Sequence, residues 1–281
     1  MKYGSLVEAV NGIMSQYDVQ LTLRQVYYRL VAAGKIPNTR SNYNQLSSQL
    51  VTARENVDVD EDRIADRSRR INDVSFDSPE SFLEVCRSTL QSNYVRRFWD
   101  SQSVYCEVWV EKDALSQVLA DAVYPFNTIV APSRGYSSYS YIRDAAARVR
   151  RYAHGKRAII LHFADHDPSG IDMSRDLEDR LVKFGNSTEV RRVALTFDQV
   201  RQYQLIPNPA KMADTRANGY VRQYGSQCWE LDAIPPDELV RLCGDAVAGL
   251  ISDPHAWQAI KEGDATDRDF MLKLIDAWEA K

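Results

Sequence analysis

Two largely apolar runs of the sequence each end in acidic residues. The run AIILHFA, residues 158–164, is followed by Asp165 and Asp167, and the run SVYCEVWV, residues 103–110, is followed by Glu111. Both runs are typical of buried strands in a parallel sheet, and the carboxyl ends of such strands meet at one edge. In an extended segment, positions separated by one residue point to the same side. Because Mg²⁺ prefers carboxylate oxygens, the sequence predicts an Mg²⁺ site formed by Glu111, Asp165 and Asp167.

The same acidic loop has three other interpretations. In an EF-hand, Asp165, Asp167 and Gly170 would occupy loop positions, but Pro168 interrupts the pattern and a strand, not a helix, leads into it. In a phosphoaspartyl enzyme, the nucleophilic Asp would follow the first strand of the α/β unit, whereas this loop follows the third. In an ordinary loop between a strand and a helix, one Asp caps the helix, and Asp172 fits that role or a place in the first turn.

A tyrosine pair in LRQVYYRL, residues 23–30, is a second candidate site. With helical spacing, Tyr27 joins the apolar stripe of its helix, whereas Tyr28 leaves that stripe and lies beside Arg24, one turn earlier. We therefore expect Tyr27 in the core and Tyr28 exposed. A phenol has a pKa of about 10, so a nucleophilic tyrosine needs a nearby positive charge, which Arg24 supplies.

The chain divides into two predicted domains, residues 1–98 and 99–281. The first contains three predicted helices, two of them joined by a tight turn, and then a polar wing and linker within residues 56–100; this order is typical of a helix-turn-helix or winged-helix module. A further helix is predicted over about residues 79–98. From residue 103 onward, four apolar strands alternate with helices, which predicts an α/β fold with a parallel sheet covered on both faces.

The acidic motifs resemble a known domain. Glu111 after the first strand, and Asp165, Asp167 and Gly170 in the pattern D-x-D-x-x-G after the third, are similar to the Toprim domain, which topoisomerases, primases and certain nucleases share. The stretch DPSGIDM resembles the DPxG segment of topoisomerase VI A subunits and of meiotic double-strand-break proteins, and WELDAI resembles the end of those A subunits. The resemblance implies a Rossmann-like Toprim domain in which Glu111, Asp165 and Asp167 hold Mg²⁺.

A second motif of the same family lies in the first domain. In that family, a winged-helix-like domain before Toprim carries Arg-x-x-Tyr-Tyr, and Arg24 and Tyr28 match it. The resemblance implies that Tyr28 attacks a DNA phosphodiester, assisted by Arg24, Glu111 and Mg²⁺, and forms a phosphotyrosyl link. It also implies a homodimer and, because we recognise no ATPase region, a separate ATPase partner subunit.

Two alternative functions stay open. Short relatives of this architecture include nuclease subunits of plasmid-defence complexes, in which the Toprim acids cut by metal-activated water and the tyrosine need not form a covalent link. A non-catalytic DNA-binding subunit of a larger complex is the third hypothesis. Replacing Tyr28 distinguishes the first two functions, and replacing Glu111 or Asp165 distinguishes an enzyme from a scaffold.

Candidate DNA contacts come from the basic residues. Lys112 adjoins the first acid, Arg54 precedes the predicted wing, and Arg148 and Arg151 belong to a basic stretch, residues 143–157. The formal net charge is −4, so a positive DNA-binding surface has to be local, or a partner supplies part of the affinity. Basic stretches of this kind are also common on ordinary solvated surfaces.

The sequence predicts no association with membranes. No run approaches the roughly 18 consecutive apolar residues of a membrane span. The first residues alternate apolar and polar side chains as in an amphipathic helix, which differs from a secretion signal. We therefore expect a cytoplasmic, nucleoid-associated protein.

Overall fold

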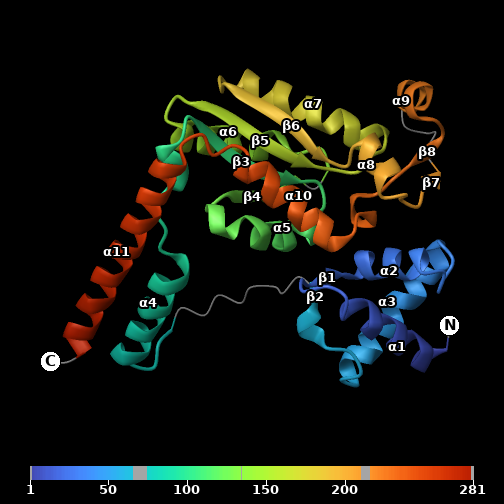
Figure 1. Ribbon diagram of the computed structural model, residues 1–281, viewed down its shortest axis with the longest axis horizontal. Helices are drawn as coiled ribbons and strands as arrows, with labels where there is room; N and C mark the ends of the chain where they lie inside the picture. The colour runs from blue at the N-terminus through green and yellow to red at the C-terminus, as the bar shows by residue number, and fades with distance from the viewer. Residues whose placement is uncertain (1, 66–74, 134, 210–215, 280–281) are drawn as a thin grey trace.

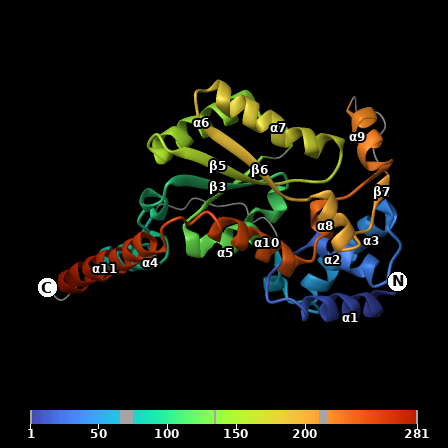
Figure 2. The same cartoon turned by 45° about the horizontal axis from the view of Figure 1, so that its top comes forward.

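The computed structural model describes residues 2–65, 75–133, 135–209 and 216–279 of the 281-residue chain (Figure 1). The protein is mixed α/β and is built around a four-stranded parallel sheet. A helical N-terminal module lies beside one end of that sheet, and a two-helix arm projects from the other end (Figures 1 and 2). Within the described ranges, no helix is long and apolar enough to cross a bilayer.

The sheet has the spatial order β4-β3-β5-β6, and every neighbouring pair is parallel. Its strands are β3 (Val104–Val110), β4 (Ile129–Pro132), β5 (Arg157–Phe163) and β6 (Thr188–Ala194). A helix separates each strand from the next, as parallel connections require. The predicted parallel sheet and its alternation of strands and helices are confirmed.

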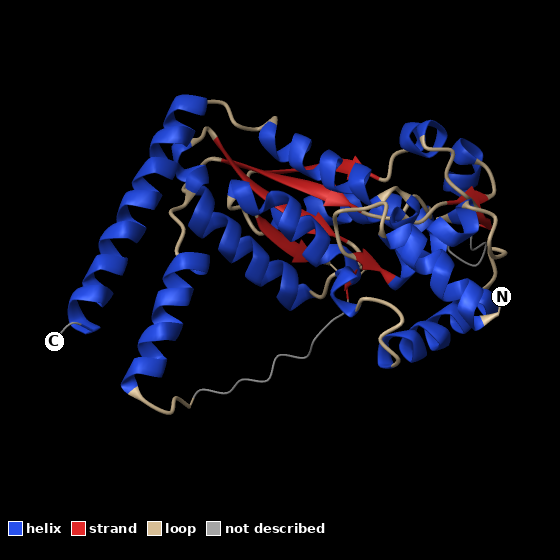
Figure 3. Cartoon of the chain, turned by 60° about the horizontal axis from the view of Figure 1, so that its bottom comes forward, coloured by secondary structure: helices blue, strands red, loops and turns tan. Residues whose placement is uncertain are grey.

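Helices cover both faces of the sheet: α5 (Ser116–Val123) and α10 (Pro236–Ala248) lie on one side, and α6 (Tyr139–Ala153) and α7 (Pro168–Lys183) on the other (Figures 1 and 3). Side chains of the central strands alternate between these layers. Val108 and Ile159 are buried with α5 and α10, whereas Trp109 and Ile160 are buried with α6 and α7. Burial on both faces explains why the strands are apolar throughout.

The N-terminal module consists of three helices, as predicted: α1 (Tyr3–Met14), α2 (Leu23–Ala32) and α3 (Arg40–Glu55). A capping box begins α2, because the Thr22 side chain accepts a hydrogen bond from Gln25 N and the Gln25 side chain accepts one from Thr22 N. Two short strands, β1 (Leu21–Thr22) and β2 (Ile64–Ala65), pair in parallel. Up to Ala65, the described residues form no antiparallel wing, and residues 66–74 of the predicted wing lie outside the described residues.

The arm consists of α4 (Pro79–Asn93) and the long helix α11 (Pro254–Glu279), which pack side by side (Figures 1 and 3). The predicted helix over residues 79–98 ends earlier, at Asn93, because the backbone of Tyr94 is extended. The Tyr94 hydroxyl donates a 2.7 Å hydrogen bond to Asp267 of α11. Helix α4 therefore packs with the second predicted domain, although the predicted boundary at residue 98 assigned it to the first. The remaining α-helices and β-strands of the described residues are α8 (Phe197–Gln202), α9 (Ala217–Tyr224), β7 (Asn208–Pro209) and β8 (Gln227–Cys228).

Candidate functional site

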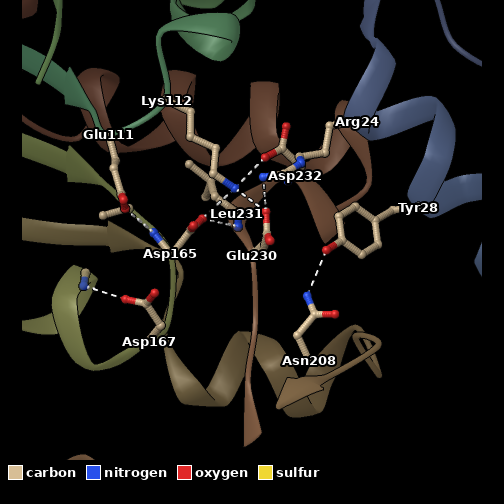
Figure 4. A network of polar contacts seen from close by, with 12 residues as sticks. Arg24, Tyr28, Glu111, Lys112, Asp165, Asp167, Asn208, Glu230, Leu231 and Asp232 are labelled. Atoms are coloured by element: carbon tan, nitrogen blue, oxygen red, sulfur yellow. Dashed lines mark hydrogen bonds and ion pairs between the residues drawn. The ribbon is translucent and has the colours of Figure 1, made fainter. Parts of the chain in front are cut away.

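Glu111 and Asp165 meet at the carboxyl edge of the sheet (Figure 4). They follow the neighbouring strands β3 and β5, and the backbone N–H of Asp165 donates a 2.9 Å hydrogen bond to Oε2 of Glu111. The backbone N–H of Glu111 donates to the Phe163 carbonyl at 2.8 Å, which extends the pairing of the strands past their ends. The two acids are thus at one edge, as their strand pattern predicted, and their role as metal ligands stays a prediction.

The Glu111 carboxyl has a pKa raised to about 7, because it is buried and because the negative charge of Asp165 is close. The backbone hydrogen bond from Asp165 and the positive charge of Lys112 lower the pKa without cancelling the rise. The surroundings of Glu111 therefore favour its neutral, protonated form over the ionised form. A cation bound beside Glu111 would favour the ionised form and lower the pKa.

Asp167 caps α7. Its Oδ1 accepts hydrogen bonds from Gly170 N at 2.6 Å and from Ser169 Oγ at 2.8 Å. The expectation that Asp172 caps the helix or lies in its first turn is wrong, because Asp172 lies in the second turn and pairs with Arg175 at 2.7 Å. A carboxylate that caps through one oxygen can still offer its second oxygen to a metal, so the predicted ligand role of Asp167 stays a prediction.

The loop that carries these acids depends on two further residues. A Cβ atom on Gly170 would lie 2.1 Å from the carbonyl oxygen of Asp165, so a larger residue would force the loop to move. Arg192 of β6 donates to the carbonyls of Ala164, Asp165 and Gly170, and burial lowers its pKa to about 10. Sequence reasoning missed Arg192, because an arginine within a strand gives no sign that it will contact a loop.

Glu111 and Asp165 are the two carboxylates at this edge that could hold Mg²⁺, although Oδ1 of Asp165 already contacts Lys112 and Leu231. Proteins commonly bind Mg²⁺ through one or two carboxylates, with water and substrate phosphate completing the shell. The approach of Glu111 and Asp165 at one strand edge is the geometric feature that would suit a cation. In the described part of the chain, no three His, Cys, Asp or Glu side chains converge as a metal-binding group, so the predicted three-ligand cage with Asp167 is not preformed.

The ammonium group of Lys112 lies among three carboxylates (Figure 4). Its Nζ is 2.9 Å from Asp165 Oδ1, 2.7 Å from Glu230 Oε2 and 2.6 Å from Asp232 Oδ2. Burial lowers the pKa of Lys112, but the negative charges of Asp232, Asp165 and Glu230 outweigh burial and hold the pKa well above its ordinary value. Lys112 is therefore already paired within the protein, which the prediction of a direct phosphate contact did not anticipate.

Glu230 and Asp232 are site residues that sequence reasoning missed. Asp232 lies in the short 3₁₀ segment Leu231–Ala233, and Glu230 directly precedes it. The backbone N–H of Leu231 donates a 2.8 Å hydrogen bond to Oδ1 of Asp165, which fixes the segment against the acidic loop. The motif WELDAI marked this stretch by resemblance alone, since neither acid follows a strand of the sheet.

Tyr28 is buried, which contradicts the prediction that it is exposed. Its side chain is 4% exposed, and so is that of Tyr27. Helix α2 packs against α1 and α3 on one side and against Leu231–Ala233 on another. Helical spacing identified only the first of these buried faces, because the second is covered by a segment far away in the sequence. The Tyr28 hydroxyl accepts a 2.9 Å hydrogen bond from Nδ2 of Asn208.

Arg24 is the cationic neighbour of Tyr28, as its position one turn earlier predicted. Its guanidinium group pairs with Glu230 and lies 5.6 Å from the ring centre of Tyr43. Burial raises the pKa of Tyr28 to about 12, and the charge of Glu230 adds to the rise, whereas the charges of Lys112 and Arg24 oppose it. The phenol is therefore protonated at neutral pH in this structure.

A cleft of about 540 Å³ opens over Tyr28. It is lined by Arg24, Tyr27, Tyr28, Asn38, Thr39, Arg40, Tyr43, Asn44, Asn208 and Glu230. All of these lining residues except Glu230 are neutral or cationic. Guanidinium, amide and hydroxyl groups are the side chains that commonly contact the phosphates and sugars of nucleic acids.

Arg148 is half-buried and already paired within the protein, and its predicted role as a DNA contact stays a prediction. Its Nε and Nη2 donate to the two carboxylate oxygens of fully buried Glu107 at 2.9 and 2.8 Å. The basic stretch gave no sign of this pairing, because Glu107 belongs to a distant strand. Arg151 is exposed on α6 with its guanidinium 5.6 Å from the Tyr152 ring centre, and Arg54 is half-buried near the end of α3. For Arg151 and Arg54, a DNA contact stays a prediction.

Comparison with known proteins assigns this chain to no family. No protein-family model and no curated protein matches it. Its function is therefore inferred from the motifs of the sequence and from the geometry of the site.

Proposed function

We propose that the protein cleaves DNA by Mg²⁺-dependent tyrosine transesterification, as a topoisomerase VI A subunit does, with Tyr28 forming a phosphotyrosyl link. One observation carries the proposal: the arginine one turn before Tyr28 and the acidic strand edge, found through two separate motifs, are connected by one set of ion pairs. Glu230 pairs with Arg24 and with Lys112, and Lys112 pairs with Asp165 (Figure 4).

In the proposed reaction, the Tyr28 oxygen forms a bond to phosphorus while the bond between phosphorus and one deoxyribose oxygen breaks. The phenolic proton passes to water, and the departing oxygen takes up a proton to become a free hydroxyl end. Arg24 stabilises the charge on the phosphate through its fork of donors. Mg²⁺, held by Glu111 and Asp165 with Asp167 as a further predicted ligand, would neutralise charge on the phosphate oxygens.

The proposal also covers the two domains. Residues 1–98 would form a winged-helix-like DNA-binding domain, and residues 99–281 a Toprim domain with a C-terminal helical extension. The helical N-terminal module and the parallel sheet support this assignment, with the exception of α4, which packs on α11.

The partners follow from the same resemblance. DNA would be the substrate, a homodimer would place one cleft on each strand of a duplex, and a separate subunit would supply ATPase activity. The polar and cationic lining of the cleft over Tyr28 supports a phosphate backbone as its ligand. A nucleoid-associated location would follow from DNA binding.

Trapping of DNA-linked protein tests the proposal. The full chain is incubated with end-labelled duplex DNA and Mg²⁺, the reaction is stopped with detergent, and covalent complexes are separated on a denaturing gel. We expect an adduct with the wild type and none with Tyr28→Phe or with EDTA. The control is Tyr139→Phe, which removes the same atom from a side chain that is 67% exposed on α6. An adduct of undiminished yield with Tyr28→Phe would refute the proposed nucleophile.

A metal-dependent nuclease without a covalent intermediate is the second candidate. It is favoured by the burial of Tyr28 and by the rise of its pKa to about 12, which burial causes. In that case Tyr28→Phe retains Mg²⁺-dependent cleavage, and the wild type gives no adduct. Glu111→Ala abolishes cleavage under either mechanism. DNA binding by a wild type that neither cleaves nor forms an adduct would instead indicate the non-catalytic DNA-binding subunit.

A further inference from the structure

Glu230 places a negative charge in a cleft that is otherwise lined by neutral and cationic groups. One of its oxygens, Oε2, contacts Nη1 of Arg24 and Nζ of Lys112, the latter at 2.7 Å. Arg24 comes from the N-terminal module, and Lys112 follows the sheet strand β3. Two cations from different parts of the fold therefore converge on a single anionic oxygen.

This arrangement matches the chemistry of a phosphodiester. A phosphodiester carries one negative charge spread over two oxygens, as a carboxylate does. Arg and Lys side chains bind both groups through charge-assisted hydrogen bonds. Arg24 lines the cleft together with hydroxyl and amide groups of Tyr28, Asn38 and Asn208, which could contact the sugar–phosphate chain. Lys112 is not among the lining residues and is 17% exposed, so it is reached where Glu230 now lies.

We propose that Arg24 and Lys112 form a subsite for a DNA backbone phosphate, and that Glu230 occupies it until the phosphate displaces its carboxylate. The inference rests on the proposed function, because it assumes that DNA enters the cleft. In this role, Glu230 is neither a metal ligand nor a nucleophile, and its carboxylate competes with the substrate phosphate for Arg24 and Lys112.

The surroundings of Glu230 allow it to leave. Its side chain is 23% exposed, whereas that of Asp232, the other acid of the segment, is 1% exposed and cannot move without exposing the buried contact to Lys112. When Glu230 leaves, Lys112 keeps its contacts to Asp165 and Asp232. Arg24 is 40% exposed and remains solvated. Displacement of Glu230 therefore leaves no buried charge without a partner.

The competition would make the site selective for chains of phosphates. A single phosphate gains little from Arg24 and Lys112, because it exchanges one anionic partner for another. A DNA strand adds contacts along the rest of the cleft, and these can offset the displacement of Glu230.

A change that removes only the charge tests the inference. Binding of the full chain to a fluorescently labelled duplex is measured by anisotropy over a salt series, without divalent metal, so that no cleavage occurs. We expect Glu230→Gln to bind about three- to tenfold more tightly than the wild type, as one additional charge-assisted contact would.

The matched control is Glu84→Gln, which makes the same charge change on the arm at a side chain that is 74% exposed. Its affinity should equal that of the wild type. The tighter binding of Glu230→Gln should disappear when Arg24→Gln is added, because a cation for which Glu230 and the phosphate compete is then absent. Glu230→Asp keeps the charge but shortens the side chain, so its affinity for the duplex should rise by less than that of Glu230→Gln. It replaces Glu230→Gln in the test if that variant is unstable in a thermal melt.

The outcomes distinguish the inference from the function on which it rests. Unchanged or weaker DNA binding by both folded Glu230 variants would overturn the role of Glu230 and leave DNA cleavage by Tyr28 intact. If neither the wild type nor any variant binds DNA, the proposed function fails, and the inference fails with it.

Discussion

The side-chain amide of Asn208 donates a 2.9 Å hydrogen bond to the hydroxyl oxygen of Tyr28. Asn208 also accepts a 3.1 Å hydrogen bond from Asn38, and Asn38 accepts a 3.0 Å hydrogen bond from the hydroxyl of Tyr27. The two adjacent tyrosines are thus joined through two asparagines from different parts of the chain. A donor held on the phenol oxygen stabilises the phenolate and fixes the direction in which Tyr28 can attack.

Replacing Asn208 by Asp should therefore impair Tyr28 specifically. The change replaces a donor by a negative charge, so we expect the pKa of Tyr28 to rise further and adduct formation near pH 8 to slow by about tenfold or more. The measurement is the initial rate of adduct formation between pH 7 and 10, and the rise in rate should move to higher pH. Asn127→Asp, before β4, is the control. Adduct rates equal to those of the wild type at every pH would argue against a positioning role for Asn208.

Stability should depend on pH through Glu111. Its folded-state pKa of about 7 lies above the ordinary carboxyl value of about 4.3, because the carboxyl is buried near Asp165. The folded state then holds a proton that the unfolded state has lost, so the free energy of unfolding falls as the pH rises between these two values. In EDTA, Glu111→Gln should raise the melting temperature at pH 8 and change it little at pH 4.5. An equal effect at both values would show that the charge of Glu111 is not the cause.

Much of the fold could be predicted from the sequence, because it depends on local patterns. Strands buried on both faces are apolar throughout, and helices such as α2 show an apolar stripe, so the alternation of strands and helices and the parallel sheet were predictable. The meeting of Glu111 and Asp165 followed from the same logic, since neighbouring parallel strands share an edge. The strand order, β4-β3-β5-β6, had to come from the structure.

Contacts between distant segments could not be predicted in this way. Tyr28 is off the first apolar stripe of α2, yet it is buried and bonded to Asn208, and nothing local to α2 encodes that contact. Arg148 belongs to a basic stretch, but its partner is Glu107 in a strand many residues earlier. Glu230 and Asp232 reach the site through a turn whose place in space depends on the whole fold. A sequence pattern identifies residues with reactive side chains. It does not show which distant residues already pair with them in the folded protein.

Mg²⁺ should stabilise the protein through the acidic edge. We expect millimolar Mg²⁺ to raise the melting temperature at pH 8, where Glu111 is ionised, by about 2–4 °C for each kcal/mol of binding energy. Glu111→Gln and Asp165→Asn should each abolish the shift. Asp167→Asn distinguishes the two roles of that residue: as a cap alone it would lower stability by about 1 kcal/mol and keep the Mg²⁺ shift, whereas as a ligand it would lose the shift. A shift of wild-type size in Glu111→Gln would place the ion elsewhere.

Arg148 should matter for stability and not for DNA. Glu107 is fully buried and also accepts hydrogen bonds from the Tyr105 hydroxyl at 2.8 Å and from the Trp109 indole at 2.9 Å. Arg148→Ala leaves that carboxylate without its counter-ion, so we expect the free energy of unfolding in urea to fall by about 3–5 kcal/mol. Arg151→Ala, on the same helix but exposed, should change it by less than about 0.5 kcal/mol. If Arg148→Ala instead keeps its stability and weakens DNA binding, the guanidinium leaves Glu107 to contact DNA.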